Sequence, residues 1–419
     1  MKNLLPLILT FCAFQTYALN VNIPDADFKS YLVGHTLINT NNDSEIQVSE
    51  AESYTGSIGI IYDGISDLTG IEAFTELTSL TCSHNNINAL DVSANTKLTS
   101  LSCDDNNIST LDITNNTELT HLVCGKNNLT TLDLSQNTKL TYISIDENSI
   151  ATIDFSQNLE MTNLTCDENS LTSLDLSKNT KITNLNAGDN PVGTLDLTKN
   201  TALKFVTIPD MGLSSIDLSQ NTAMIHFLAY RNVLTSLDVQ YNLALSKITI
   251  WQNNLTELDV SMLPNLSSLS VATNSLTSLN LKNGNNTKMQ YTHSFNASSN
   301  PNLTCIQVDD TSYSNNAWPN LDSTASFMED CSMITGVADN NYYQEVKIFP
   351  NPSNGAFSIN ANGGINLIQV YDISGKLVES IKPNKTNSLI NFTIDQPGIY
   401  ITQVTSKSVT ETLRIVVSK

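Results

Sequence analysis

The chain of 419 residues is longer than an ordinary domain, and 20 Lys and Arg against 41 Asp and Glu give it a net charge of −21 and a pI near 4.4. Nucleic acids and anionic membrane surfaces are recognised through clustered basic side chains, so this composition argues against both classes of partner. The charge is uneven, because residues 341–419 hold seven Lys and Arg and five Asp and Glu. We therefore expect two modules of different character.

Residues 1–18 have the pattern of a secretory signal peptide. Lys2 precedes an apolar run from Leu4 to Phe14, and small residues stand at positions −3 and −1 of a cut after Ala18. The run is too short to cross a bilayer, and the residue before Cys12 does not fit a lipoprotein signal. We expect an exported protein without a membrane-spanning segment.

Residues 19–64 are predicted to form an N-terminal cap with a helix, a polar loop and a second short helix. The loop resembles an EF-hand or dockerin calcium loop, because oxygen-bearing side chains alternate and a Glu stands at position 12. It departs from that pattern in having Asn at position 1 and Ser44 in place of the turn glycine. The resemblance implies a calcium site, and the alternative is a polar turn. The candidate ligands are Asn39, Asn41, Asp43, Glu45 and Glu50.

Residues 65–288 are repetitive. After an atypical half-repeat that begins at Ile65, the pattern Leu77-x-x-Leu80-x-Cys82-x-x-Asn85 returns every 21 residues. This period and spacing are typical of leucine-rich repeats. A second run in each repeat also alternates, so we expect a mainly β solenoid of ten repeats, with two parallel sheets and little helix.

Two rows of the repeat are expected to lie in the core. One is an Asn whose buried carboxamide bonds the turn backbones, found at Asn85, Asn106, Asn127, Asn148, Asn169, Asn190, Asn232, Asn253 and Asn274, with Met211 as the exception. The other accepts Ile, Ala, Val or Cys and contains Cys82, Cys103, Cys124 and Cys166. We interpret these cysteines as buried free thiols, because in-register strands place them in a line and not in a tetrahedron around a metal.

A third row is acidic. It contains Asp91, Asp112, Asp133, Asp154, Asp175, Asp196, Asp217, Asp238 and Asp259 and ends with Asn280. At a strand spacing of about 4.8 Å such charges repel unless they accept hydrogen bonds or stay solvated. The preferred interpretation is an Asp that stabilises each corner, and the alternative is a row of bound cations.

Residues 289–335 are predicted to be a C-terminal cap, followed by a linker at 336–344. Cys305 and Cys331 fall within this irregular cap of an exported chain, which favours a disulfide between them.

Residues 345–419 alternate short apolar runs with Gly, Pro and Asn, a pattern typical of a small β-sandwich. Four motifs closely resemble the type A C-terminal sorting domain of the type IX secretion system of Bacteroidota. They contain Pro350, Asn351, Pro352, Gly355, Asp372, Gly375, Lys376, Gly398, Tyr400 and the terminal Lys419. The resemblance implies contact with the type IX machinery, passage across the outer membrane, removal of the domain, and surface attachment or release. The repeats and the N-terminal cap likewise resemble leucine-rich-repeat surface proteins of those bacteria.

Catalysis is not indicated by the sequence. His121 and His226 share a row but stand five repeats apart, or about 24 Å at strand spacing. The chain has no nucleophile elbow, zinc-protease motif or phosphate loop. We therefore expect no enzyme activity and no certain cofactor.

Binding is better supported, because aromatic and long side chains replace small ones at outward positions of the later repeats. These are Tyr142, Phe205, His226, Leu228, Tyr230, Lys247 and Trp251. The alternative is that they pack against one another or under the cap. The acidic residues beside them form a solvated face or attract a basic partner. The leading hypothesis is a surface-displayed or secreted recognition protein for a protein or glycan, and the alternative is a structural surface or matrix component.

Overall fold

The computed structural model describes residues 19–333, 346–383, 387–406 and 409–418. The chain divides into two compact units, Met1–Ile334 and Thr335–Lys419. The expected signal peptide, the expected linker and Lys419 lie outside the described residues, so these three predictions stay predictions.

The N-terminal cap consists of α1 (Ala26–Gly34), α2 (Val48–Ser53) and the loop between them, as the sequence predicted. The Asp25 side chain caps α1 by accepting hydrogen bonds from the backbone N–H groups of Asp27 and Phe28. Phe28 and Leu32 are fully buried and pack into the same core as the first repeats. A short 3-10 helix, η1 (Ile71–Ala73), follows β1 (Ser57–Gly59), the first strand of the solenoid. The cap thus covers the open end of the repeat core.

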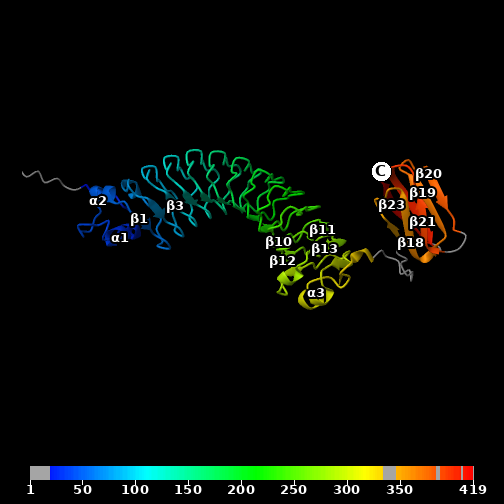
Figure 1. The fold of residues 1–419 in the computed structure, drawn as a ribbon. Coiled ribbons are helices and arrows are strands. Elements are labelled where there is room, and N and C mark those ends of the chain that lie inside the picture. The colour runs from blue at the N-terminus through cyan, green and yellow to red at the C-terminus, as the bar shows by residue number, and fades with distance from the viewer. Residues whose placement is uncertain (1–18, 334–345, 384–386, 407–408, 419) are drawn as a thin grey trace, which may run out of the picture. The chain divides into compact units, whose positions relative to one another are not determined.

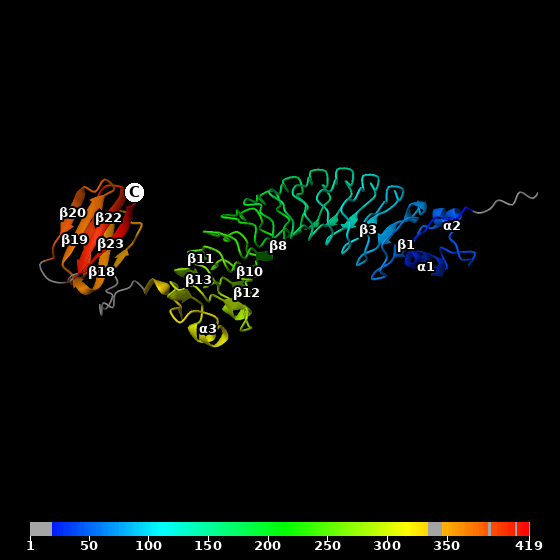
Figure 2. The ribbon, with the colours of Figure 1, turned by 180° about the vertical axis from the view of Figure 1, so that it is seen from behind.

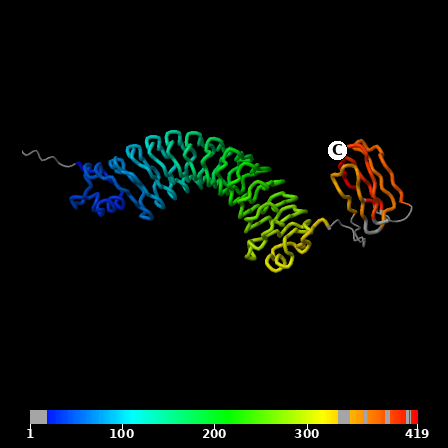
Figure 3. The backbone as a smooth tube through the Cα atoms, viewed as in Figure 1, coloured from blue at the N-terminus to red at the C-terminus, as the bar shows by residue number. Residues whose placement is uncertain are grey.

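A single parallel sheet of 12 strands runs along the inner side of the curved solenoid (Figures 1 and 2). Adjacent strands pair in register, as where Leu80 pairs with Leu101, so every repeat adds one strand. The tube in Figure 3 shows the turns following one another along the arc. After β1 the sheet contains β2 (Ser79–Thr81), β3 (Ser100–Ser102), β4 (His121–Val123), β5 (Tyr142–Ser144), β6 (Asn163–Thr165), β7 (Asn184–Asn186), β8 (Phe205–Thr207), β9 (His226–Leu228), β10 (Lys247–Thr249), β12 (Ser268–Ser270) and β14 (Phe295–Asn296).

The second sheet is much shorter than the sequence predicted. It has four strands, β11 (Glu257–Asp259), β13 (Ser278–Asn280), β15 (Cys305–Gln307) and β16 (Ser326–Met328). In the earlier repeats the second run buries its apolar residues without forming strands. Backbone hydrogen bonds still join successive turns there, as where Asn107 N donates to Ile87 O at 2.9 Å. The expectation of two sheets along the whole solenoid was therefore wrong. Alternation of apolar and polar residues fixes which side chains point inward, but it does not fix the lateral spacing that a ladder of backbone hydrogen bonds requires.

The C-terminal cap closes the other end of the repeat core around Trp318. This side chain is 1% exposed, and its ring centroid lies 5.0 Å from that of Phe295 and 5.6 Å from that of Phe327. A disulfide joins Cys305 to Cys331, with a Cα–Cα distance of 5.8 Å. The cap also contains η2 (Asn286–Lys288), α3 (Thr311–Ala317) and η3 (Cys331–Met333).

The C-terminal unit has two antiparallel sheets and its own core, which includes Phe357, Val370 and Val404. One sheet has the order β17 (Val346–Phe349), β18 (Ala356–Ile365) and β21 (Asn387–Thr393). The other has the order β20 (Leu377–Ile381), β19 (Leu367–Asp372), β22 (Gly398–Ser406) and β23 (Val409–Val417).

Candidate functional site: the strand face of the solenoid

Each strand of the long sheet buries its central residue and turns its two outer residues outward. In β2, for example, Leu80 is fully buried while Ser79 and Thr81 are half-buried. Because the strands pair in register, the first residues of successive strands form one outward row and the third residues form another. The strand face is therefore two parallel rows of side chains on a rigid support.

The first outward row contains most of the predicted binding residues. From β4 to β10 it reads His121, Tyr142, Asn163, Asn184, Phe205, His226 and Lys247. The His121 ring stacks on Tyr142 at 6.1 Å, and Phe205 meets His226 edge to face at 5.1 Å. Burial and the positive charge of Lys247 lower the pKa of His226, which favours its neutral form. Leu228, in the other outward row, is half-buried.

Tyr230 and Trp251 lie beside the strands, in the loops that follow β9 and β10. Their rings are stacked 4.7 Å apart, and the guanidinium of Arg231 lies 5.2 Å from the Tyr230 ring and 5.8 Å from the Trp251 ring. Arg231 also forms ion pairs with Asp210 and, at 3.5 Å, with Asp189. Both rings are half-buried, so the predicted binding residues are exposed in part and also pack against one another.

The repeat position that directly follows Tyr230 and Trp251 has a left-handed backbone conformation in all ten repeats. The φ angles lie between 48 and 59°, and none of the residues is glycine. Several of them pair along the row: His84 Nδ1 lies 2.6 Å from Asp105 Oδ2, and Lys126 forms an ion pair with Glu147 at 3.2 Å. The row contains His84, Asp105, Lys126, Glu147, Glu168, Asp189, Asp210, Arg231, Gln252 and Thr273. Many of the acidic residues that the sequence placed beside the binding residues therefore have a partner of their own. Because no glycine stands at these positions, the sequence does not predict the left-handed turn.

Tyr142 and Phe205 line one hollow of about 270 Å³ on the strand face. Between them lie Asn163 and Asn184, which sequence reasoning did not single out, because an Asn among Ser, Thr and Asn residues looks like an ordinary member of a polar row. His226, Tyr230 and Trp251 do not line this hollow. The predicted surface thus has two parts: the hollow with its flanking rings, and the Tyr230–Trp251 stack.

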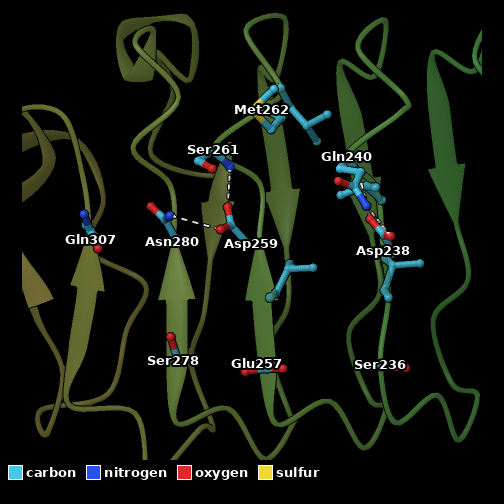
Figure 4. A pocket seen from close by; sticks show the side chains of 14 residues that line it. Ser236, Asp238, Gln240, Glu257, Asp259, Ser261, Met262, Ser278, Asn280 and Gln307 are labelled. Atoms are coloured by element: carbon cyan, nitrogen blue, oxygen red, sulfur yellow. Dashed lines mark hydrogen bonds between the residues drawn. The ribbon is translucent and has the colours of Figure 1, made fainter. Parts of the chain in front are cut away.

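A larger hollow, of about 660 Å³, lies over the second run of the repeats, where the segment 236–240, β11, β13 and β15 contribute its lining (Figure 4). Its carboxylates bond neighbouring groups: Asp259 accepts from Ser261 N at 2.8 Å and from Asn280 Nδ2 at 3.2 Å. Asp238 accepts from the backbone N and the Nε2 of Gln240 at 3.0 and 2.8 Å. These acidic residues belong to the corner row predicted from the sequence.

The whole acidic row makes the same contact. Each Asp accepts a hydrogen bond from the backbone N–H two residues later, and Asn280 does so from Lys282 N. The pKa of Asp133, for example, lies below its usual range because the Ser135 N–H donates to it at 2.8 Å. Among the described residues no group of three or more His, Cys, Asp or Glu side chains is arranged to hold a metal. The contacts favour the corner interpretation over a row of cations.

The calcium-like loop is closed by its own hydrogen bonds. Glu50 accepts from Gln47 N, from Thr40 N and Oγ1, and from Asn41 N. Burial alone would raise the pKa of Glu50, but these donors lower it. Asp43 accepts from Glu45 N, Asn41 Nδ2 and Gln47 Nε2. Glu45 pairs with Lys29 at 2.7 Å. The Asn39 side chain donates to the carbonyls of Val33 and Asp43 at 2.9 and 2.8 Å. The carboxylate oxygens of Asp43, Glu45 and Glu50 are thus bonded to protein donors, which favours the polar-turn alternative, whereas Asn39 Oδ1 is buried without a partner among the described residues. Calcium binding stays a prediction.

The motifs of the C-terminal unit shape its fold. Asn351 Nδ2 donates to Arg414 O at 2.8 Å, and its Oδ1 accepts from Val416 N at 2.9 Å, which ties the chain before β18 to the last strand. Gly355 has a φ of 117°, and a Cβ there would lie 2.7 Å from Ile394 O, so only glycine fits.

The second and third motifs support a hairpin and a strand start. Asp372 Oδ1 accepts from the N–H groups of Ser374 and Lys376 at 2.9 and 3.0 Å, and Gly375 turns the hairpin with a φ of 82°. Gly398 begins β22, and the buried Tyr400 donates its hydroxyl proton to Gln396 O at 2.9 Å. Pro350 and Pro352 both follow cis peptide bonds.

Residues 347–418 match the family described as the secretion system C-terminal sorting domain. They are a type IX secretion sorting domain. The sorting domain directs its carrier to the cell surface or the extracellular space, so the solenoid is an exported module. In the parts of the chain that the structure describes, no helix has the length and apolar content needed to cross a bilayer.

Solved structures resemble the chain at low identity, and no curated protein matches its sequence. The functional domain of InlJ from Listeria monocytogenes, described as including a cysteine ladder, is 24% identical over 96% of this chain and 98% of its own, with a TM-score of 0.48. The internalin InlF of Listeria monocytogenes is 20% identical over 75% and 94%, with a TM-score of 0.48. The leucine-rich-repeat protein LIC12759 of Leptospira interrogans is 14% identical over 67% and 97%, with a TM-score of 0.42.

Proposed function

We propose that the exported solenoid is a recognition module that binds a protein or a glycan through its strand face and has no catalytic activity of its own. One observation carries the proposal: exposed aromatic rings interrupt rows of small polar residues on a rigid sheet. Phe205 is 37% exposed and His226 beside it is half-buried; Tyr230 and Trp251, stacked in the loops after β9 and β10, are half-buried as well. Rigid, amphipathic rings of this kind supply much contact area for little conformational entropy, which suits a binding hot spot.

The test is binding of the purified protein to arrays of proteins and glycans. Replacing Tyr230 and Trp251 together by Ala, or Phe205 by Ala, is expected to weaken binding to any array ligand. Tyr241 is 54% exposed on a turn away from the strand face, so Tyr241→Ala is the matched control and is expected to leave binding unchanged. Array binding that survives all of the strand-face substitutions would show that the partner uses another surface.

A structural role is the second candidate, and a different surface favours it. Tyr241, Leu243 and Met262 are 54, 49 and 59% exposed, and they occupy neighbouring turns away from the strands. An apolar patch of this kind can hold two copies of a solenoid together. Concentration-dependent assembly of the purified protein, abolished by Met262→Ser with Leu243→Ser and accompanied by no array ligand, would establish this role in place of recognition.

A further inference from the structure

The hollow on β5–β8 is bounded by two aromatic rings and floored by amides and hydroxyls. Tyr142, Asn163, Asn184 and Phe205 are the paired first residues of four consecutive strands. The two rings are three strand spacings apart, which is about 14 Å. Thr165, Asn186 and Thr207 from the neighbouring row complete the floor. His121 stacks behind Tyr142 and His226 packs against Phe205, so each ring is supported from outside the hollow.

The two central amides have capacity to bond a ligand. The Asn163 carboxamide oxygen accepts one hydrogen bond, from the Thr162 hydroxyl at 2.9 Å, and the Asn184 oxygen accepts the equivalent bond from the Thr183 hydroxyl at 2.9 Å. In the part of the chain that the structure describes, the Nδ2 of each carboxamide has no protein partner, and both side chains line the hollow. Each amide is therefore oriented by the protein at one end and open at the other.

The charges around the hollow select against anions. None of its lining residues is acidic or basic. The acidic rim beside it, in the loops that follow β5 and β6, consists of Asp146, Asp167 and Glu168, which form no ion pair within the described residues. Burial, with the negative charges of Asp146 and Glu168 nearby, raises the pKa of Asp167, which also accepts from Asn186 Nδ2 at 2.8 Å. This rim would repel sulfated, phosphorylated or uronic-acid ligands.

Neutral carbohydrate fits these features together. A pyranose presents C–H groups on its faces, which stack on aromatic rings, and hydroxyls at its edges, which both donate to and accept from carboxamides. An apolar peptide side chain would leave the amides of Asn163 and Asn184 unpaired on binding, at a cost in free energy. We propose that β5–β8 form a subsite for a neutral oligosaccharide of a few units, stacked on Tyr142 and Phe205 and hydrogen-bonded by Asn163 and Asn184. This inference rests on the proposed recognition function and names its ligand class.

The experiment titrates the full exported protein, by calorimetry, with soluble neutral oligosaccharides of glucose, mannose and xylose. Binding of at least one of them is expected, and Tyr142→Ala, Phe205→Ala and the pair Asn163→Ala with Asn184→Ala should each weaken it about tenfold, the value of a lost stacking or hydrogen-bonding contact near 1.4 kcal/mol. Tyr142→Phe should retain the stacking and most of the affinity. Tyr241→Ala, on an exposed turn outside the hollow, is the matched control and should leave the affinity unchanged.

Three results would overturn the inference. The first is that all the variants of the hollow bind neutral glycans as tightly as the unaltered protein does and have the same melting temperature. Another is binding of basic peptides, and of no neutral glycan, at the hollow. A third is a protein ligand lost with Tyr230 and Trp251 while the hollow binds nothing, which would leave the proposed recognition function standing. Assembly of the protein without any ligand would remove both proposals.

Discussion

At the scale of single residues, two Asn rows hold successive turns together, although the sequence singled out only one of them. In the second row, the fully buried Asn137 donates from its Nδ2 to Ile113 O at 2.9 Å and to Asn116 O at 3.0 Å. The same pair of contacts recurs along the row, as with Asn116 to Val92 O and Asn95 O. Each of these carbonyls also accepts a backbone N–H, Ile113 O from Asn116 and Asn116 O from Leu119, so the amide adds a second hydrogen bond that links one turn to the next.

Asn137→Ala is expected to lower the free energy of unfolding by roughly 2 kcal/mol, because two hydrogen bonds between successive turns are lost in the core. Chemical denaturation followed by circular dichroism measures the change. The adjacent and exposed Gln136 provides the control, since Gln136→Ala should change stability by less than about 0.5 kcal/mol. Equal effects of the two substitutions would contradict this role of the row.

The left-handed turn row predicts a stabilising substitution. Gln252 has a φ of 59° and an exposed side chain, so Gln252→Gly removes backbone strain and should raise the free energy of unfolding by up to about 1 kcal/mol. Gln136 is also an exposed turn glutamine, but it lies outside this row. Gln136→Gly should therefore lower stability, and a gain at both positions in thermal melts would argue against strain at the turn.

The buried thiols predict a dependence of stability on pH. Burial, with the negative charge of Asp146 as a smaller cause, raises the pKa of Cys124 from its ordinary 9.0 to about 12. The unfolded chain loses this proton near pH 9 and the folded chain keeps it, so the thiol's contribution is complete below pH 9 and is lost as the pH rises towards 12. Between these two pH values the free energy of unfolding should fall by up to about 1.4 kcal/mol per pH unit for one thiol.

Cys124→Ala tests this dependence, because the same row accepts Ala at Ala187 and Ala229. Denaturation midpoints measured between pH 8 and pH 11 should fall less steeply for this variant than for the unaltered protein. Identical slopes would mean that Cys124 is not a protonated buried thiol in the folded protein.

At the scale of elements, the C-terminal cap depends on a covalent link between the start of β15 and η3. The bond from Cys305 to Cys331 closes a segment with a sequence separation of 26, which in chain-entropy terms stabilises the fold by about 3 kcal/mol. Replacing both cysteines by Ala should lower the unfolding midpoint of the cap. Trp318 fluorescence in a Trp251→Phe background reports on the cap, and Cys82→Ala is the control. A cap that unfolds no earlier without the bond would contradict this prediction.

The elements were predictable from the sequence to different degrees. Rows that repeat identically, such as Leu80 and its equivalents, predict an in-register parallel sheet, because only one register places every one of them inside. The second sheet was overestimated, because the alternation at Ile87, Leu90 and Val92 determines burial and not lateral pairing. The hollow could not be foreseen, since the importance of Asn163 and Asn184 arises from their position between two rings on other strands. The left-handed turns were also missed, because Asp, Lys, Glu and Arg occupy them in place of Gly.

At the scale of the whole molecule, the sorting domain makes export separable from recognition. Deleting residues 345–419 should trap the protein in the periplasm, which cell fractionation would detect. Gly355→Ala is a more local test, because the added Cβ would meet Ile394 O at 2.7 Å and should disturb this domain alone. Surface display of the truncated protein would contradict the role of the domain, and a change in ligand affinity on truncation would show that the two modules are not independent.

The in-register addition of one strand for every 21 residues also bears on how such a chain changes over generations. A duplication or loss of one complete repeat leaves each remaining residue with neighbours of the same kind, so the gene can lengthen or shorten without refolding its product. An insertion of any other length would shift the Leu, Asn and Asp positions out of line with the adjacent turn. Variation between related chains should therefore appear as changes in repeat number and as substitutions on the strand face, where Tyr142 and Phe205 already depart from the pattern.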